Sequence, residues 1–149
     1  MGLVTGACLA DFGNRVTCVD GDARKVERLS RLEIPFFEPG LPEIVARNVH
    51  EGRLVFSDDL PNALKGSRVV FITVGTPPRK DGSADIRAIF EVARVIARNL
   101  DGYKLVVQKS TAPVGTARAV KAHMRRHAKR GAEFDVASNP EFLREGSAI

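Results

Sequence analysis

Residues 69–74 (VVFITV) are the feature that most limits what this chain can fold into. The run is almost uninterruptedly apolar and β-branched or aromatic, which is typical of a strand covered on both faces in a parallel sheet. Residues 84–100 follow it with apolar side chains at the helical repeat, and residues 104–108 form a second apolar run. Strands that alternate with amphipathic helices predict an α/β fold with a Rossmann-type, doubly wound parallel sheet.

The rest of the chain continues this alternation. We expect helices at residues 2–12, 22–31, 41–51, 84–100 and 116–129, and strands at residues 15–20, 54–57, 69–74, 104–108 and 134–138. A doubly wound sheet usually begins with a strand and a glycine turn, whereas this chain begins with a helix. We therefore expect residues 1–149 to be one domain of a Rossmann type with its first strand missing from the chain.

The charge of the chain allows two classes of partner. A formal net charge of +5 suits an anionic ligand or a nucleic acid equally well. The one dense basic cluster, residues 121–130, lies at the end of a predicted helix, where the helix dipole favours positive charge. We interpret the cluster as a solvated helix end, and we expect no nucleic-acid partner.

The two cysteines and the hydropathy pattern indicate in which cellular compartment the protein is expected. Cys8 and Cys18 lie in separate apolar runs, so we expect small buried hydrophobic residues rather than a disulfide or a metal site. We expect no signal peptide, and the sequence contains no apolar run of about 18 residues. We therefore expect no membrane partner and a reducing, cytoplasmic setting.

Asp20 is a candidate cofactor residue at the end of the strand expected at residues 15–20. It lies eighteen positions after Gly2, a spacing at which a carboxylate accepts hydrogen bonds from the adenosine ribose of NAD. A free carboxylate there also repels the 2′-phosphate of NADP. The alternative is that Asp20 only ends the strand or caps the next helix, although Asp22 is better placed as the cap.

Polar loops follow three further predicted strands. Residues 75–78 (GTPP) begin with a glycine that would let a ligand approach the backbone, and residues 108–116 (QKSTAPVGT) bring hydroxyl groups. Residues 139–146 (NPEFLREG) carry two carboxylates four positions apart. Each loop by itself could be a simple turn, but ligands bind where the carboxyl ends of parallel strands meet.

These segments are similar to those of a known family. The quoted sequences are GLVTGACLADFGNRVTCVD (2–20), EIPFFEPGL (33–41), VVFITVGTP (69–77), DGSAD (81–85), KSTAPVGT (109–116) and SNPEFLREGSA (138–148). Together they resemble the N-terminal, NAD-binding domain of the UDP-glucose/GDP-mannose dehydrogenase family, most closely its UDP-glucose members. The resemblance implies oxidation of the primary alcohol of a nucleotide sugar to a carboxylate, with two NAD and a covalent cysteine intermediate.

The resemblance also implies roles for individual residues. Thr111 would hold a water near the reacting carbon, and Glu141 would perform acid–base work on that water. The expected contacts to NAD are at Gly2, Asp20, Lys25, Val74, Gly75, Thr76, Pro77, Ser110, Thr111 and Glu145. The expected contacts to the sugar substrate are at Glu141, Phe142, Leu143, Arg144 and Glu145, and no metal is expected.

Some family features have no counterpart in these residues. The nucleophilic cysteine, the central helix of the dimer and the UDP-sugar-binding domain would lie downstream, and Cys8 and Cys18 match no nucleophile position. We therefore expect the parent to be a homodimer or larger oligomer, and this chain alone to be inactive. Alternatives left open are a GDP-mannose or UDP-N-acetylhexosamine 6-dehydrogenase fragment, and a non-catalytic NAD-binding remnant.

Overall fold

A computed structural model of the chain describes residues 2–144 and 146–149. The chain forms two compact units, one made of Met1–Ala63 with Phe142–Ile149, and the other of Leu64–Glu141. Glu145, for which contacts to NAD and the substrate are predicted, lies outside the described residues. No helix in the described part combines the length and the apolar character needed to cross a bilayer.

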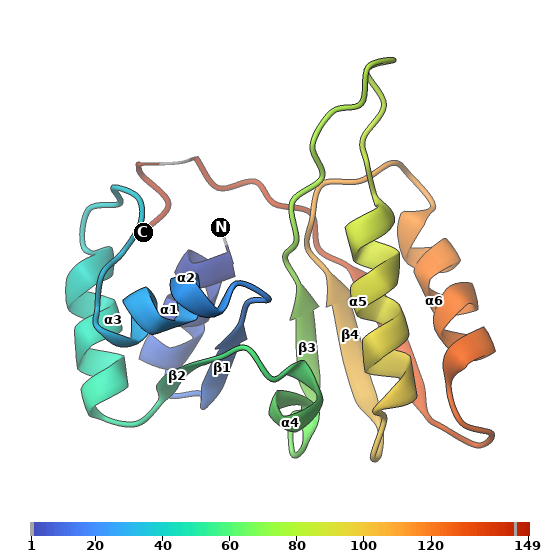
Figure 1. The fold of residues 1–149 in the computed structure, drawn as a ribbon, viewed down its shortest axis with the longest axis horizontal. Helices are drawn as coiled ribbons and strands as arrows, with labels where there is room; N and C mark the ends of the chain where they lie inside the picture. The colour runs from blue at the N-terminus through green and yellow to red at the C-terminus, as the bar shows by residue number, and fades with distance from the viewer. Residues whose placement is uncertain (1, 145) are drawn as a thin grey trace. The chain divides into compact units, whose positions relative to one another are not determined.

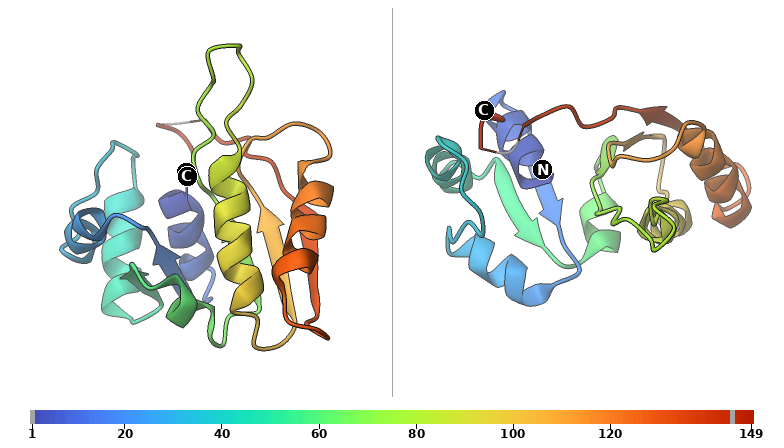
Figure 2. Two further views of the ribbon diagram at one scale, coloured as in Figure 1. Left: turned by 45° about the vertical axis from the view of Figure 1, so that its right-hand side comes forward. Right: turned by 90° about the horizontal axis from the view of Figure 1, so that it is seen from above.

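The first unit is built on two parallel strands, in register from the pair Val16 and Leu54 to the pair Val19 and Ser57. Its elements are α1 (Gly2–Asp11), β1 (Val16–Val19), α2 (Ala23–Ser30), α3 (Leu41–His50) and β2 (Leu54–Ser57). Helices α1 and α3 pack together on one face of the strands, and α2 lies on the other (Figures 1 and 2).

Close packing of α1 on β1 holds this unit together. Val4, Ala7 and Ala10 of α1 are fully buried in one cluster with residues of α3 and β2. A Cβ atom at Gly6 would lie 2.5 Å from the Cys18 Sγ atom, so only glycine lets the helix approach the strand this closely. Cys8 and Cys18 are half-buried against the same cluster, less completely than expected, and both are free thiols.

Local capping explains where α2 begins. The Asp22 side chain accepts hydrogen bonds from the backbone N–H groups of Arg24, at 3.0 Å, and Lys25, at 3.4 Å. These bonds satisfy two of the amides that a helix start leaves unpaired. The prediction that Asp22 rather than Asp20 caps this helix is confirmed.

The second unit contains a three-stranded parallel sheet in the order β3-β4-β5. Its elements are β3 (Val69–Ile72), α5 (Arg87–Arg98), β4 (Lys104–Gln108), α6 (Thr116–His127) and β5 (Phe134–Ser138), and the short α4 (Leu60–Leu64) ends where the unit begins. Helices α5 and α6 pack against each other on the same face of the sheet (Figure 1). The apolar stripe predicted for residues 84–100 is confirmed, since Ile89, Ala93 and Ile96 are fully buried.

Lys104 is an unexpected buried charge at the start of β4. Its side chain is 2% exposed, and its Nζ atom lies 2.6 Å from the Asp101 carboxylate. The same atom donates hydrogen bonds to the carbonyl oxygens of Leu64, at 2.7 Å, and Ser67, at 2.8 Å. The ammonium thus satisfies the backbone at the end of α4, which is what a buried charge requires.

The predicted elements are present, and the strands are parallel, but they do not form one continuous sheet. Strand β1 pairs with β2, and β3 pairs with β4, and no strand in the described residues joins β1 to β3. The strands therefore form two separate parallel sheets, β1-β2 and β3-β4-β5. That the first strand of a doubly wound sheet is missing from the chain stays a prediction.

We predict that Cys18 alkylates slowly in the folded protein. Burial raises the pKa of its thiol to about 11. Two pKa units correspond to about 100-fold less reactive thiolate at neutral to mildly basic pH. Alkylation by iodoacetamide, followed by peptide mass spectrometry, should keep accelerating between about pH 9 and 10.5 in native protein. A native rate equal to that in urea, with a plateau near pH 9, would contradict the prediction.

Candidate functional site

The register of the second unit aligns the carboxyl ends of its three strands. Ile72 of β3 pairs with Gln108 of β4, which in turn pairs with Ser138 of β5. Thr111 comes three residues after Gln108, and Glu141 three residues after Ser138. The two predicted catalytic residues therefore leave neighbouring parallel strands at matching positions, at the edge where α/β sheets bind ligands.

Glu141 is fixed by a lysine that the sequence analysis did not select. The Lys109 Nζ atom lies 3.4 Å from the Glu141 Oε2 atom, and the two side chains are only 12% and 13% exposed. Lys109 also donates a hydrogen bond of 3.4 Å to the Asn139 side-chain oxygen. The backbone N–H of Asn139 donates to the Gln108 carbonyl oxygen at 3.0 Å, which continues the β4–β5 pairing into this loop. The carboxylate is thus held in one place beside an ammonium group.

Ser110 connects two of the predicted cofactor loops. It is buried, and its hydroxyl donates to the Val74 carbonyl oxygen at 2.7 Å and lies 3.3 Å from that of Ile72. The backbone N–H groups of Lys109 and Ser110 also point at the Ile72 carbonyl oxygen, at 3.0 and 3.2 Å. These bonds explain why β3 ends at Ile72 and not at Val74 as predicted, because the β4 loop takes over its last carbonyl groups.

The loop after β3 leaves room for a ligand. Val74 and Thr76 are half-buried, whereas Gly75 and Pro77 are exposed. A Cβ atom added at Gly75 would meet nothing within 4 Å, so the backbone at this position is open to close approach. Thr111 is exposed as well, so its hydroxyl is accessible to a bound molecule.

Asp20 and Lys25, two predicted cofactor residues, form an ion pair in the first unit. The Asp20 Oδ1 atom also accepts a hydrogen bond of 3.1 Å from the Asp22 backbone N–H. Burial of the Asp20 carboxyl opposes its ionisation, but the hydrogen bonds from Lys25 and Asp22 and the Lys25 charge outweigh it and lower the pKa. Asp20 is therefore a fixed anion with part of its surface open to a ligand.

Gly2 is the first residue of α1, whose first turn contains no acidic side chain. The backbone N–H groups and the dipole at such a helix start favour an anion, and a phosphate group is the usual ligand. The predicted contact of Gly2 with NAD is compatible with this geometry.

Three of the predicted sugar-binding residues, Phe142, Leu143 and Arg144, are exposed, whereas Glu141 is half-buried. Phe142 is 88% exposed and Leu143 44% exposed, and Arg144 is exposed too. The next residues are held by hydrogen bonds: the backbone N–H groups of Gly146 and Ala148 donate to the Glu38 carboxylate at 2.8 and 2.6 Å. Sequence reasoning missed Glu38, although it lies in one of the quoted segments (33–41).

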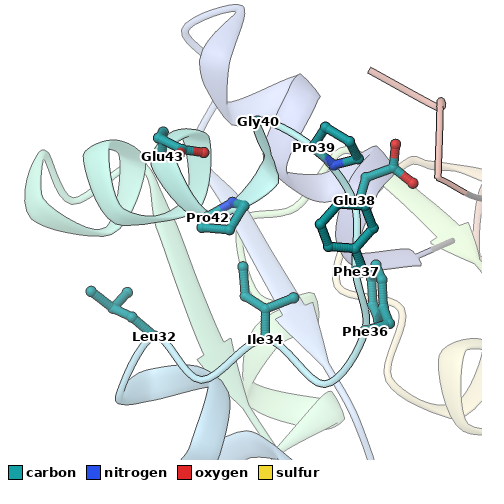
Figure 3. A pocket seen from close by; sticks show the side chains of 9 residues that line it. All are labelled: Leu32, Ile34, Phe36, Phe37, Glu38, Pro39, Gly40, Pro42 and Glu43. Carbon is teal, nitrogen blue, oxygen red and sulfur yellow. The ribbon is translucent and has the colours of Figure 1, made fainter.

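A cavity of about 310 Å³ lies in the first unit beside this contact. It is lined by Leu32, Ile34, Phe36, Phe37, Glu38, Pro39, Gly40, Pro42 and Glu43 (Figure 3). None of the predicted site residues is among these lining residues. Within the described residues, no group of three or more His, Cys, Asp or Glu side chains is arranged to hold a metal ion.

Comparison with known proteins matches this geometry to one family. Residues 1–149 match the NAD binding domain of the UDP-glucose/GDP-mannose dehydrogenase family. The chain belongs to that family. A UDP-glucose 6-dehydrogenase of Rhizobium meliloti (strain 1021) is 53% identical to it over 150 residues, which are 100% of this chain and 34% of that protein. The UDP-glucose 6-dehydrogenase TuaD of Bacillus subtilis (strain 168) is 47% identical over 149 residues, or 32% of that protein.

Solved structures of the family have the same fold. A UDP-glucose dehydrogenase from Pyrobaculum islandicum superposes with a TM-score of 0.93 at 42% identity, over 99% of this chain and 35% of that one. A GDP-mannose dehydrogenase from Pseudomonas aeruginosa gives the same TM-score, 0.93, at 35% identity, over 99% of this chain and 35% of that one. The chain thus spans about a third of the length of the relatives that it matches.

We predict that Ser110→Ala destabilises the second unit by about 1–2 kcal/mol, because it leaves the half-buried Val74 carbonyl oxygen without the hydroxyl that donates to it. Urea denaturation of the full-length protein that contains this chain measures the loss. Ser138→Ala, at an exposed position at the end of β5, is the matched control and should change stability by no more than about 0.5 kcal/mol. Equal midpoints for the two variants would contradict the role given to Ser110.

Proposed function

We propose that this chain is the NAD-binding portion of a UDP-glucose 6-dehydrogenase, which oxidises UDP-glucose to UDP-glucuronate with two NAD. The observation that carries the proposal is the identity of 53% and 47% to proteins of that name over the whole chain. In this proposal residues 1–149 are an incomplete N-terminal domain of a cytoplasmic homodimer or larger homo-oligomer. The dimerisation helix and the UDP-sugar-binding domain belong to other parts of the parent protein.

The chain's own groups fit NAD. The amino end of α1, with no acid in its first turn, suits the pyrophosphate, and Asp20 suits the adenosine ribose hydroxyls. Lys25, paired with Asp20, would contact the adenosine half, and the open backbone at Gly75 would contact the cofactor together with Val74, Thr76 and Pro77. Ser110 would act mainly by holding this loop through Val74.

The residues after β4 and β5 suit the reaction. When bound, NAD accepts a hydride from the alcohol carbon, and a proton must leave the oxygen. The Thr111 hydroxyl, which is exposed, would hold a water, and Glu141 would take a proton from that water in the hydrolytic half of the reaction. Lys109 would keep Glu141 in position during the exchange.

The covalent step needs a nucleophile from outside these residues. The pKa of Cys18, about 11, makes its thiol a poor nucleophile, and the pKa of Cys8 is raised as well, by burial and by the charges of Asp11 and Glu38. We therefore propose that the isolated chain is inactive. Formation of NADH from UDP-glucose by the pure 149-residue chain would refute this.

The test of substrate is a spectrophotometric assay of the full-length protein with NAD. UDP-glucose should yield two NADH per sugar. GDP-mannose is the first alternative substrate to test, because the chain is 35% identical to a GDP-mannose dehydrogenase. Faster oxidation of GDP-mannose or of a UDP-N-acetylhexosamine than of UDP-glucose would assign a different substrate within the same family. Binding of NAD without turnover of any nucleotide sugar would favour a non-catalytic remnant.

We predict that Asp20→Ala raises the KM for NAD about tenfold or more, because hydrogen bonds from ribose hydroxyls to a carboxylate are lost. The preference for NAD over NADP should fall at the same time. The control is Glu27→Ala, which removes an exposed ion pair with Arg31 on the same helix. Steady-state kinetics with both cofactors measure the change, and an unaltered cofactor preference in Asp20→Ala would count against the assignment.

We predict that Glu141→Gln lowers kcat by about 10²–10⁴, the usual loss when a general acid–base group is removed. The amide keeps the size of the side chain but cannot take a proton. Glu133→Gln, at an exposed position before β5, should keep wild-type kcat. Turnover of Glu141→Gln within about threefold of wild type would show that another group performs the proton transfer.

A further inference from the structure

We propose that Glu38 is a positioning residue, which holds the sugar-binding segment after β5 through the backbone N–H groups of Gly146 and Ala148. This inference rests on the proposed function, because it gives Glu38 its role through residues 142–144. It adds a residue to that site which lies more than a hundred positions earlier in the chain, since the two hydrogen bonds span 108 and 110 positions.

The first argument is the burial of the Glu38 carboxylate. Glu38 is only 4% exposed, and a buried carboxylate is costly unless donors surround it. Its two oxygen atoms each accept one backbone N–H, from Gly146 at 2.8 Å and from Ala148 at 2.6 Å. Hydrogen bonds to a charged acceptor are stronger than those between neutral groups. The carboxylate and the segment therefore stabilise each other.

The second argument is that Glu38 lies on a fixed support. Its backbone carbonyl oxygen accepts a hydrogen bond of 3.2 Å from the Leu41 N–H at the start of α3, and Leu41 is fully buried. Gly40 takes a left-handed conformation, with φ of 79°, which turns the loop into the helix. In Figure 3 the Glu38 carboxylate is directed towards the trace of the C-terminal segment. The acid is thus presented by a loop anchored in the core of the first unit.

The third argument comes from the segment itself. The Ser147 N–H donates to the Arg144 carbonyl oxygen at 3.2 Å, so the residues that bind Glu38 are joined by a turn to Arg144. Ala148 packs against the core cluster of α1 and α3. Residues 142–144, in contrast, are exposed and available to a ligand. Glu38 fixes the chain directly beyond them, which lowers the entropy that the segment must lose when substrate binds.

The test is Glu38→Gln in the full-length protein, with Glu43→Gln as the matched control. Both changes remove one negative charge from the lining of the same cavity, but Glu43 is exposed. The glutamine side chain keeps one acceptor oxygen for one of these two backbone N–H groups. Its N–H₂ group would face the other backbone N–H, so that hydrogen bond is lost. We expect amide hydrogen exchange at Gly146 and Ala148 to accelerate about tenfold or more in Glu38→Gln and to stay unchanged in Glu43→Gln.

The kinetic readout separates positioning from general stability. Glu38→Gln should raise the KM for UDP-glucose about tenfold while kcat stays within about twofold, whereas a global loss of structure would lower kcat in proportion to the folded fraction. Ala148→Pro removes one of the two backbone N–H groups that donate to Glu38, and it should also raise the KM for UDP-glucose. Because both variants break the same contact, their effects on KM should be clearly less than additive in the double variant.

The outcomes distinguish this inference from the function on which it rests. Unchanged exchange at Gly146 and Ala148 in Glu38→Gln, or additive effects in the double variant, would overturn the inference even in an active enzyme. A wild-type protein that oxidises no nucleotide sugar would overturn the proposed function and the sugar-binding part of this inference together. Exchange would still show in that case whether Glu38 holds the segment. Glu38→Asp, which keeps the charge, gives a milder variant if Glu38→Gln does not fold.

Discussion

The parallel register of β3, β4 and β5 is the constraint from which the second unit's site follows. Because Ile72, Gln108 and Ser138 lie in one row, the three loops that follow them leave the sheet at one edge. Ser110 then reaches Val74, and Lys109 reaches Glu141, over distances that only this register allows. A slip of one residue would turn every side chain of a strand to the opposite face. It would also separate the serine and the lysine from their partners.

The segment from Asn139 to Ala148 is held by two acids in chemically different ways. Glu141 faces the ammonium group of Lys109 at 3.4 Å, a contact between two side chains that can rearrange. Glu38 faces two backbone N–H groups, which can only donate hydrogen bonds and do not exchange protons during a reaction. The first arrangement suits acid–base work and the second suits permanent fixation. This difference supports giving a catalytic role to Glu141 and a positioning role to Glu38.

The parts of this structure that depend on local pattern could be predicted from the sequence, and those that depend on distant contacts could not. The apolar run at residues 69–74, the helical stripe at residues 84–100 and the cap at Asp22 all carry their signal within a few neighbouring residues. Lys104 looked like an ordinary strand residue, because the carbonyl groups of Leu64 and Ser67 that it binds are met only after folding. Glu38 and Lys109 could not be selected from the sequence either, because their partners lie far from them along the chain.

The pairing of Asp20 with Lys25 refines how this chain would select its cofactor. An isolated carboxylate would repel the 2′-phosphate of NADP by charge alone, but the adjacent ammonium offsets part of that repulsion. What remains specific to Asp20 is its ability to accept a hydrogen bond from the 2′-hydroxyl of the adenosine ribose, a donor that NADP lacks because its 2′-oxygen carries the phosphate. The Lys25 and Asp22 contacts lower the Asp20 pKa, so the acceptor stays ionised across neutral and mildly acidic pH. Selection of NAD in this site would therefore depend on hydrogen-bond chemistry as well as on charge.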